Sequence, residues 1–120
     1  MNVMVVDDEA DVQDLFEQRF RKEVSSGRIT FTFALSAEEA LRLLDQMVEE
    51  VSLILSDINM PGMNGLDLLK AVKEKHRHLR VFMITAYGNA EYLQRARAYG
   101  CDDYLTKPID FSMLKTKLLA

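Results

Sequence analysis

The sequence is poor in cysteine, proline and glycine, and these shortages limit the kind of protein it can be. Its one cysteine, Cys101, cannot form a disulfide within the chain, and no Cys/His group has the spacing of a zinc site. Two prolines and five glycines do not gather into a linker. The 120 residues are therefore expected to fold as one domain, 1–120, which is long enough to bury a core without disulfides or a structural metal.

Long hydrophobic runs and an excess of positive charge are missing as well. No apolar stretch approaches the ~20 residues that span a bilayer, and Asp7 and Asp8 follow the start too closely for a signal peptide. The chain has 15 Lys and Arg against 19 Asp and Glu, a net charge of -4. Because nonspecific nucleic-acid affinity comes from clustered Lys and Arg, we expect a cytoplasmic domain that binds neither nucleic acid nor membrane directly.

Short apolar runs alternate with helical patterns along the chain. The predicted strands are 3–6, 29–34, 53–55, 81–84 and 103–106, and the predicted helical stripes are 12–20, 37–48, 68–72, 92–96 and 111–118. The stripe at 37–48 follows Ser36 and Glu39, which have the spacing of a capping box. Strict alternation of strand and helix predicts a parallel sheet with helices on both faces.

Two of the predicted strands differ from the other three. The run at 29–34 alternates large apolar residues with threonine and the run at 103–106 is mixed, whereas the remaining runs are continuously apolar. Alternation is typical of a strand at the edge of a sheet. We therefore expect a doubly wound, five-stranded α/β fold of order 2-1-3-4-5, which is flavodoxin-like. In such folds ligands bind beyond the carboxyl ends of the strands, between strands one and three.

Polar residues follow four of the five predicted strands. Asp7 and Asp8 follow the first, Asp57 the third, Thr85 the fourth and Lys107 the fifth. Two unit charges ~4 Å apart repel each other by roughly 4 kcal/mol at an effective dielectric constant of about 20, so three carboxylates at one rim need a cation. Carboxylates without His or Cys partners are the ligands of a hard ion such as Mg²⁺.

Asp57 is the candidate nucleophile of this rim. It stands alone after its strand, and the loop that follows contains one proline and two glycines at 61–65, which we expect to leave the side chain accessible. An aspartate can take a phosphoryl group as a mixed anhydride when the charge on the transferred oxygens is neutralised. Mg²⁺ and Lys107 would neutralise that charge, and the Thr85 hydroxyl could donate to a phosphoryl oxygen.

Four segments together resemble the receiver domain of two-component response regulators. They read VVDDE at 5–9, SDINMPGMNG at 56–65, ITA at 84–86 and DDYLTKP at 102–108. Found in this order, they cover essentially the whole chain. The resemblance implies a signalling switch that takes a phosphoryl group from a sensor histidine kinase or a phosphotransfer protein, catalyses its own phosphorylation and slow dephosphorylation, and changes its output surface.

The resemblance also implies a set of metal ligands around the phosphoacceptor. Asp57 would accept the phosphoryl group and bind Mg²⁺. Asp8 would bind the ion directly and Asp7 through water, while Asn59 would contribute its backbone carbonyl. Asn59, two residues after Asp57, and Tyr87, two residues after Thr85, occupy positions that tune the lifetime of the phosphoryl group in the family, so that lifetime is left open.

A second set of residues would contact the phosphoryl group and report its presence. The resemblance gives this role to Thr85, Lys107 and the backbone of Ala86. Tyr104, three residues before the lysine, would be the aromatic residue that turns inward as the threonine moves toward the phosphoryl group. The family also suggests a cis peptide bond between Lys107 and Pro108.

The resemblance leaves the output and the assembly open. An output domain would begin where the chain ends at Ala120, so we expect either a single-domain regulator or part of a longer protein. The last predicted helix carries little acid beyond Asp110 to pair across a two-fold axis, so dimerisation is not assumed. Two residues depart from the family pattern: Asn64 stands where the family often has aspartate, and Cys101 stands where alanine is usual. Neither belongs to the proposed phosphorylation site.

Three other functions compete with the receiver. A magnesium-dependent phosphatase with an aspartyl nucleophile usually has a second aspartate two positions on, where this chain has Asn59, and needs a cap segment. A flavin or nucleotide module would have a loop rich in Gly, Ser or Thr in place of Asp7, Asp8 and Glu9. A pseudo-receiver that is never phosphorylated would not need the full set of polar residues at the rim.

Overall fold

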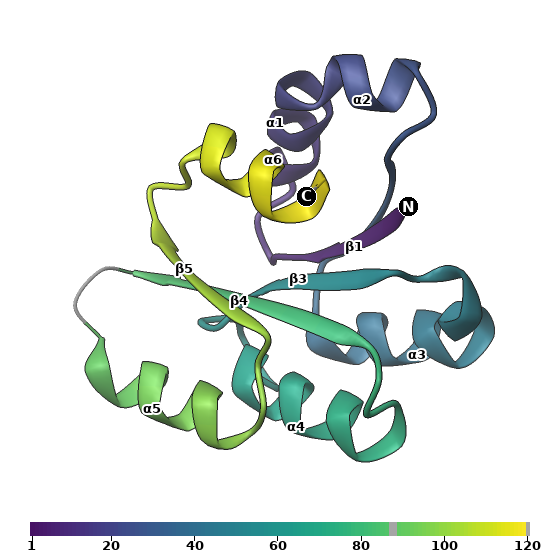
Figure 1. Ribbon diagram of the computed structural model, residues 1–120. Helices are drawn as coiled ribbons and strands as arrows, with labels where there is room; N and C mark the ends of the chain where they lie inside the picture. Colours follow the sequence, from purple (N-terminus) through teal and green to yellow (C-terminus); the bar gives the residue numbers. More distant parts are fainter. Residues whose placement is uncertain (87–88, 120) are drawn as a thin grey trace.

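The computed structural model describes residues 1–86 and 89–119 (Figure 1). Its five strands are β1 (Asn2–Val6), β2 (Thr30–Ala34), β3 (Leu53–Asp57), β4 (Arg80–Ala86) and β5 (Asp103–Lys107). All four strand pairs are parallel, and the strands lie in the order β2-β1-β3-β4-β5. This order confirms the predicted doubly wound sheet with β2 and β5 at its edges.

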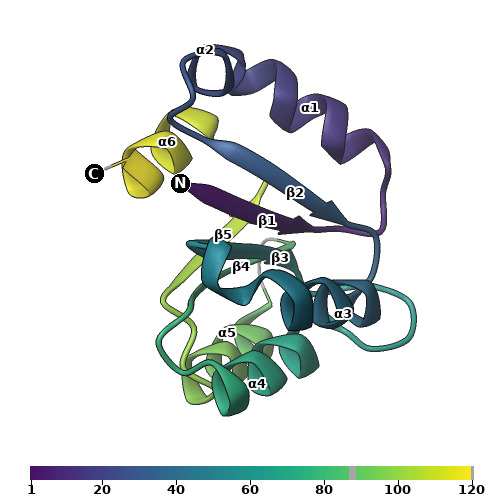
Figure 2. The ribbon, with the colours of Figure 1, turned by 90° about the vertical axis from the view of Figure 1, so that its right-hand side faces the viewer.

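Helices cover both faces of the sheet (Figure 2). On one face lie α1 (Asp11–Arg19), α2 (Arg21–Ser25) and α6 (Phe111–Leu119), and on the other lie α3 (Ala37–Met47), α4 (Gly65–Lys75) and α5 (Ala90–Ala98). A short 3₁₀ turn at Val48–Glu50 follows α3. In the part of the chain that the structure describes, no helix is long and apolar enough to cross a membrane.

The strands separate two hydrophobic cores. Because successive side chains of a strand point to opposite faces, Leu53 and Leu55 pack with α1 and α6, whereas Ile54 packs with α3 and α4. Every residue of β3 is buried, but three of the five residues in β2 are only half-buried. This difference in burial is the physical reason for the two sequence patterns that identified the edge strands.

The first predicted helical stripe is interrupted. Phe20 leaves the helical conformation, with φ −107° and ψ 21°, so α1 ends at Arg19 and α2 begins at Arg21. Phe16 and Phe20 still stack in the core, with ring centroids 5.9 Å apart. Leu15, which the stripe also places in the core, is 37% exposed instead.

Side-chain caps fix the starts of α3 and α4. The Ser36 hydroxyl accepts a hydrogen bond from the Glu39 N–H (3.0 Å), but the Glu39 carboxylate accepts from Leu35 rather than from Ser36, so the predicted capping box is only half formed. A complete box that the sequence pattern did not single out begins α4. There Asn64 accepts from the Asp67 N–H (2.9 Å), and Asp67 accepts from the Asn64 N–H (3.4 Å).

Candidate functional site

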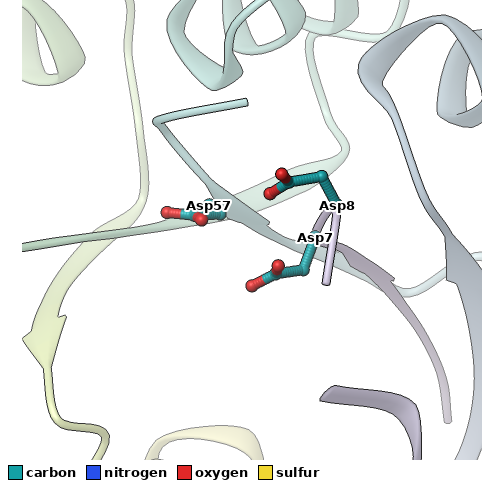
Figure 3. Close-up of side chains that lie close together, drawn as sticks. All are labelled: Asp7, Asp8 and Asp57. Atoms are coloured by element: carbon teal, nitrogen blue, oxygen red, sulfur yellow. The ribbon is translucent and has the colours of Figure 1, made fainter. Parts of the chain in front are cut away.

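Three carboxylates meet at the carboxyl end of the sheet (Figure 3). Asp7 and Asp8 follow β1, and Asp57 is the last residue of the neighbouring strand β3. One carboxylate oxygen from each residue lies within 4.8 Å of the other two. The acidic cluster therefore lies between strands one and three, where the topology of the sheet predicts a ligand site.

Burial differs sharply among the three carboxylates. Asp8 is exposed, Asp7 is 9% exposed and Asp57 is 5% exposed. The expectation that the following loop leaves the Asp57 side chain accessible is therefore wrong. The loop turns back over the strand, since the Gly65 N–H donates to the Ile58 carbonyl (2.8 Å), and only a small part of the Asp57 carboxylate faces solvent.

Lys107 brings a positive charge to the cluster from the edge of the sheet. Its Nζ lies 3.1 Å from Oδ2 of Asp57, and its side chain is 41% exposed. Partial burial lowers the pKa of the Lys107 ammonium, but the hydrogen bond and the charge of Asp57 outweigh that effect, so the pKa is raised. Lys107 is therefore charged at neutral pH and partly compensates the three carboxylates.

Asp7 is the carboxylate whose ionisation the site opposes most clearly. Burial raises its pKa, and the negative charges of Asp57 and Asp8 raise it further. The Glu9 N–H, which donates to Oδ1 of Asp7 (2.9 Å), and the charge of Lys107 act in the other direction without cancelling the rise. A proton and a metal ion would thus compete for this carboxylate.

Thr85 and Tyr104 lie together on the face that α3, α4 and α5 cover. Thr85 is fully buried, and its hydroxyl has no hydrogen-bond partner among the described residues. Burial raises the pKa of the Tyr104 hydroxyl, and the neighbouring Thr85 hydroxyl offsets part of the rise, although the two do not meet in hydrogen-bond geometry. The structure therefore brings Thr85 next to Tyr104 but does not join it to Asp57 or Lys107.

Three further predicted features border this cluster. Asn59 is exposed, two residues beyond Asp57. Ala86 ends β4 and pairs with Lys107, and the peptide bond between Lys107 and Pro108 is cis, as the family resemblance suggested. Tyr87, which was singled out for the phosphoryl lifetime, lies outside the described residues.

Residues 3–119 match the sequence model of a family described as the response regulator receiver domain. The chain belongs to this family. An uncharacterized 14.6 kDa protein of Leptolyngbya boryana is 43% identical over 112 residues, a match that covers 92% of this chain and 81% of the relative. Sporulation initiation phosphotransferase F of Bacillus subtilis is 32% identical, and the match covers 94% of this chain and 86% of the relative.

The solved structures agree with the family match. The crystal structure of response regulator protein TrrA of Thermotoga maritima, in complex with Mg²⁺ and BeF, is one of them. Its sequence is 27% identical to this chain. The match covers 98% of this chain and 96% of that chain, with a TM-score of 0.81.

Some relatives are much longer than this chain. Three of them are named as regulators, including PilR of Pseudomonas aeruginosa, and this chain spans only 22–48% of their length.

The family match bears on two of the three functions that compete with the receiver. Receiver domains are phosphorylation-dependent signalling switches of two-component systems that interact with histidine kinases or phosphotransfer proteins, and this chain is homologous to them over its whole described fold. The match favours a receiver over an aspartyl phosphatase or a flavin module.

Gly65 is a residue of the site that the sequence pattern treated only as part of a loop. A Cβ atom added to it would lie 2.1 Å from the carbonyl oxygen of Asp57 and 2.8 Å from Cα of Ile58. Contacts this short between a Cβ and backbone atoms do not occur in real proteins. Gly65 therefore lets α4 begin directly against the end of β3, and the only sequence signal was a glycine eight residues after the aspartate.

Proposed function

We propose that this receiver domain accepts a phosphoryl group on Asp57. The observation that carries the proposal is the position of the Asp57 carboxylate, which lies beside the carboxylates of Asp7 and Asp8 and bonds to the ammonium of Lys107 at 3.1 Å. This arrangement provides an anionic nucleophile with a cation fixed next to it. The unit that carries the activity is the whole chain, 1–120.

The donor set of the cluster fits magnesium. Three carboxylates with no His or Cys among them are the ligands of a hard ion, and the similar TrrA protein forms a complex with Mg²⁺. In this chain Asp8 and Asp57 would hold the ion directly, Asp7 would hold it through water, and the backbone carbonyl of Asn59 would complete the set. When bound, Mg²⁺ supplies positive charge that stabilises the transferred phosphoryl oxygens.

The chemical step needs an ionised nucleophile and a neutralised phosphoryl group. A carboxylate oxygen of Asp57 attacks phosphorus, the bond from phosphorus to the donor breaks, and the donor leaves with the electron pair. Lys107 is charged at neutral pH and bonds to Asp57, so it can shift its hydrogen bond to a phosphoryl oxygen. The backbone of Ala86, paired with Lys107, borders the same position.

The buried hydroxyl of Thr85 gives the domain a means of reporting the modification. A buried polar group without a partner costs about 1–3 kcal/mol, and Thr85 is in that state among the described residues. A phosphoryl oxygen would provide an acceptor and draw Thr85 toward Asp57. Tyr104 packs beside Thr85 and could then fill the vacated space, which changes the surface of β4 and β5.

Phosphorylation of the wild-type protein tests the proposal. With millimolar Mg²⁺ and acetyl phosphate, the intact mass should increase by one phosphoryl group, and the modified peptide should contain Asp57. Excess chelator should prevent the increase, because the carboxylate cluster then lacks its cation. A wild-type protein that stays unmodified under these conditions would contradict the proposal and favour the pseudo-receiver. A phosphoryl group on another peptide would contradict Asp57 as the acceptor.

Asp8→Ala is expected to remove most of the stabilisation by magnesium. At about ten times its dissociation constant, Mg²⁺ would stabilise the wild type by about 1.4 kcal/mol, which corresponds to about 6 °C in Tm for a domain of this size. Asp8 is the exposed member of the cluster, so its removal leaves the core intact. Thermal melts with and without Mg²⁺ measure the shift, and Glu17→Ala, at an exposed acid on α1, is the control that should keep it.

The magnesium-induced rise in Tm is also expected to grow as the pH rises above 3.8, the ordinary pKa of an aspartate. The pKa of Asp7 in the folded state lies above its ordinary value of 3.8. The metal-free protein therefore keeps this proton over a range in which the unfolded chain has lost it, and it loses stability as the pH rises through that range. Magnesium competes with the proton, so its effect increases over the same range. Asp7→Asn should flatten this dependence; an unchanged slope would assign it to another group.

A further inference from the structure

A cavity of about 830 Å³ opens directly beside the proposed phosphorylation site, between α1 and the segment that joins β5 to α6. Asp7, Glu9 and Lys107 line its charged side. The remaining lining is mostly apolar and comes from the central strands, from α1 and from residues 108–111. The cavity thus joins the charged site to an apolar space, and the phosphoryl chemistry described above does not use that space.

The floor of the cavity lies on the same face of the sheet as Asp57. Ile84, which lines the cavity, pairs with Asp57 across β3 and β4. Leu55, another lining residue, precedes Asp57 by two positions in β3, so its side chain points to the same face. Lys107 both lines the cavity and bonds to Asp57. Lys107 therefore connects the proposed phosphorylation site to the cavity.

The walls of the cavity bring apolar side chains to the surface. Leu15 of α1 is 37% exposed at one wall, and Ile109 is half-buried at the opposite wall. Acidic side chains, Glu9 and Asp110, stand among the lining residues as well. Arg19 lines the cavity too, so its charged side chains are of both signs. The space suits an apolar group because most of its lining is apolar and apolar surface removed from water is favourable.

We propose that this cavity receives the apolar part of an acyl phosphate, so that the domain uses acyl phosphates with aromatic or longer alkyl groups in preference to acetyl phosphate. This inference rests on the proposed phosphorylation of Asp57. In the reaction, an ionised Asp57 oxygen bonds to phosphorus, the bond from phosphorus to the acyl oxygen breaks, and the electron pair leaves with the carboxylate of the donor. No proton has to move, and no other reactant is needed.

Benzoyl phosphate and acetyl phosphate serve as the two probes. The second-order rate constant for phosphorylation is measured with each, by intact mass, in the wild type and in Leu15→Asn, with Ile109→Asn as a second variant on the opposite wall. The matched control is Val24→Asn, because Val24 is 40% exposed on α2 and does not line the cavity. Dividing the benzoyl rate constant by the acetyl rate constant within each protein cancels differences in folding and in general reactivity.

The benzoyl-to-acetyl ratio should be about five- to tenfold higher in the wild type than in Leu15→Asn or Ile109→Asn, as expected for losing contact with part of one ring. Val24→Asn should keep the wild-type ratio. Equal ratios in all four proteins, with Asp57 labelled in each, would overturn the inference and leave the proposed function standing. Failure of both donors to label the wild type would instead overturn the proposed function, and the inference with it.

Discussion

Asp57→Asn is expected to abolish phosphorylation by small donors, with a loss of roughly a thousandfold or more in rate. The amide of asparagine has nearly the shape of the carboxylate, so it fits the site, where only 5% of Asp57 is exposed. Its oxygen can still accept the hydrogen bond from Lys107, which bonds Asp57 at 3.1 Å. What the amide lacks is the anionic oxygen that attacks phosphorus. Intact mass after incubation with acetyl phosphate and Mg²⁺ measures the loss.

Two comparisons separate this chemical effect from a general disturbance of the protein. Asp45→Asn makes the same change at an exposed aspartate that pairs with Lys75, away from the site, and should be phosphorylated like the wild type. Circular dichroism should show the same fold for both variants. Persistent labelling of Asp57→Asn would mean that Asp7 or Asp8 accepts the phosphoryl group, since these are the other two carboxylates of the cluster.

The order of the strands in the sheet could be predicted because it determines how deeply each strand is buried. The burial of a strand is visible in its own pattern of apolar and polar residues. Residues 29–34 alternate between apolar and polar because β2 has one neighbouring strand and is only partly covered. The run at 53–55 is continuously apolar because β3 is buried throughout. Once the edges are known, the parallel topology brings the strand ends to one rim, and Asp7, Asp8 and Asp57 meet there.

The burial of individual site residues could not be predicted in the same way, because it depends on segments distant in sequence. A loop with proline and glycine reads as open, yet it folds back so that Asp57 is nearly enclosed. Thr85 ends an apolar strand in the sequence, and the pattern does not show that its hydroxyl is buried beside Tyr104 without a partner among the described residues. Both outcomes depend on how separate elements pack against one another. The pattern of apolar and polar residues within one element does not predict that packing.

The break at Phe20 shows the same limit within a helix. Helical spacing from residue 12 to residue 20 predicts one amphipathic helix, and the two phenylalanines of that stripe do enter the core. The helical conformation breaks at Phe20, where α1 has ended and α2 has not begun, and Leu15 stays at the surface beside the cavity. A periodic pattern therefore identified the core residues that share one face but not the point at which the helix ends.

Gly65→Ala is expected to lower the free energy of unfolding by about 3 kcal/mol, at the upper end of what overpacking costs. The added Cβ would lie 2.1 Å from the Asp57 carbonyl oxygen and 2.8 Å from Cα of Ile58. Both are backbone atoms, so no side-chain rotation can relieve the contact, and either α4 or the end of β3 must move. A movement of β3 displaces the Asp57 carboxylate from Lys107. Phosphorylation should then slow by up to about a hundredfold, since a shift of about 1 Å can cost that much.

Gly27→Ala distinguishes this effect from the ordinary cost of replacing a glycine. Gly27 has φ +78° and no atom within 4 Å of an added Cβ, so alanine there should cost about 1 kcal/mol through backbone strain alone. It lies before β2 and should leave the phosphorylation rate unchanged. Urea unfolding and the rate of labelling measure the two effects separately. If Gly65→Ala behaves like Gly27→Ala in both, the close contact between α4 and β3 does not position Asp57, and the site tolerates a displacement of the strand end.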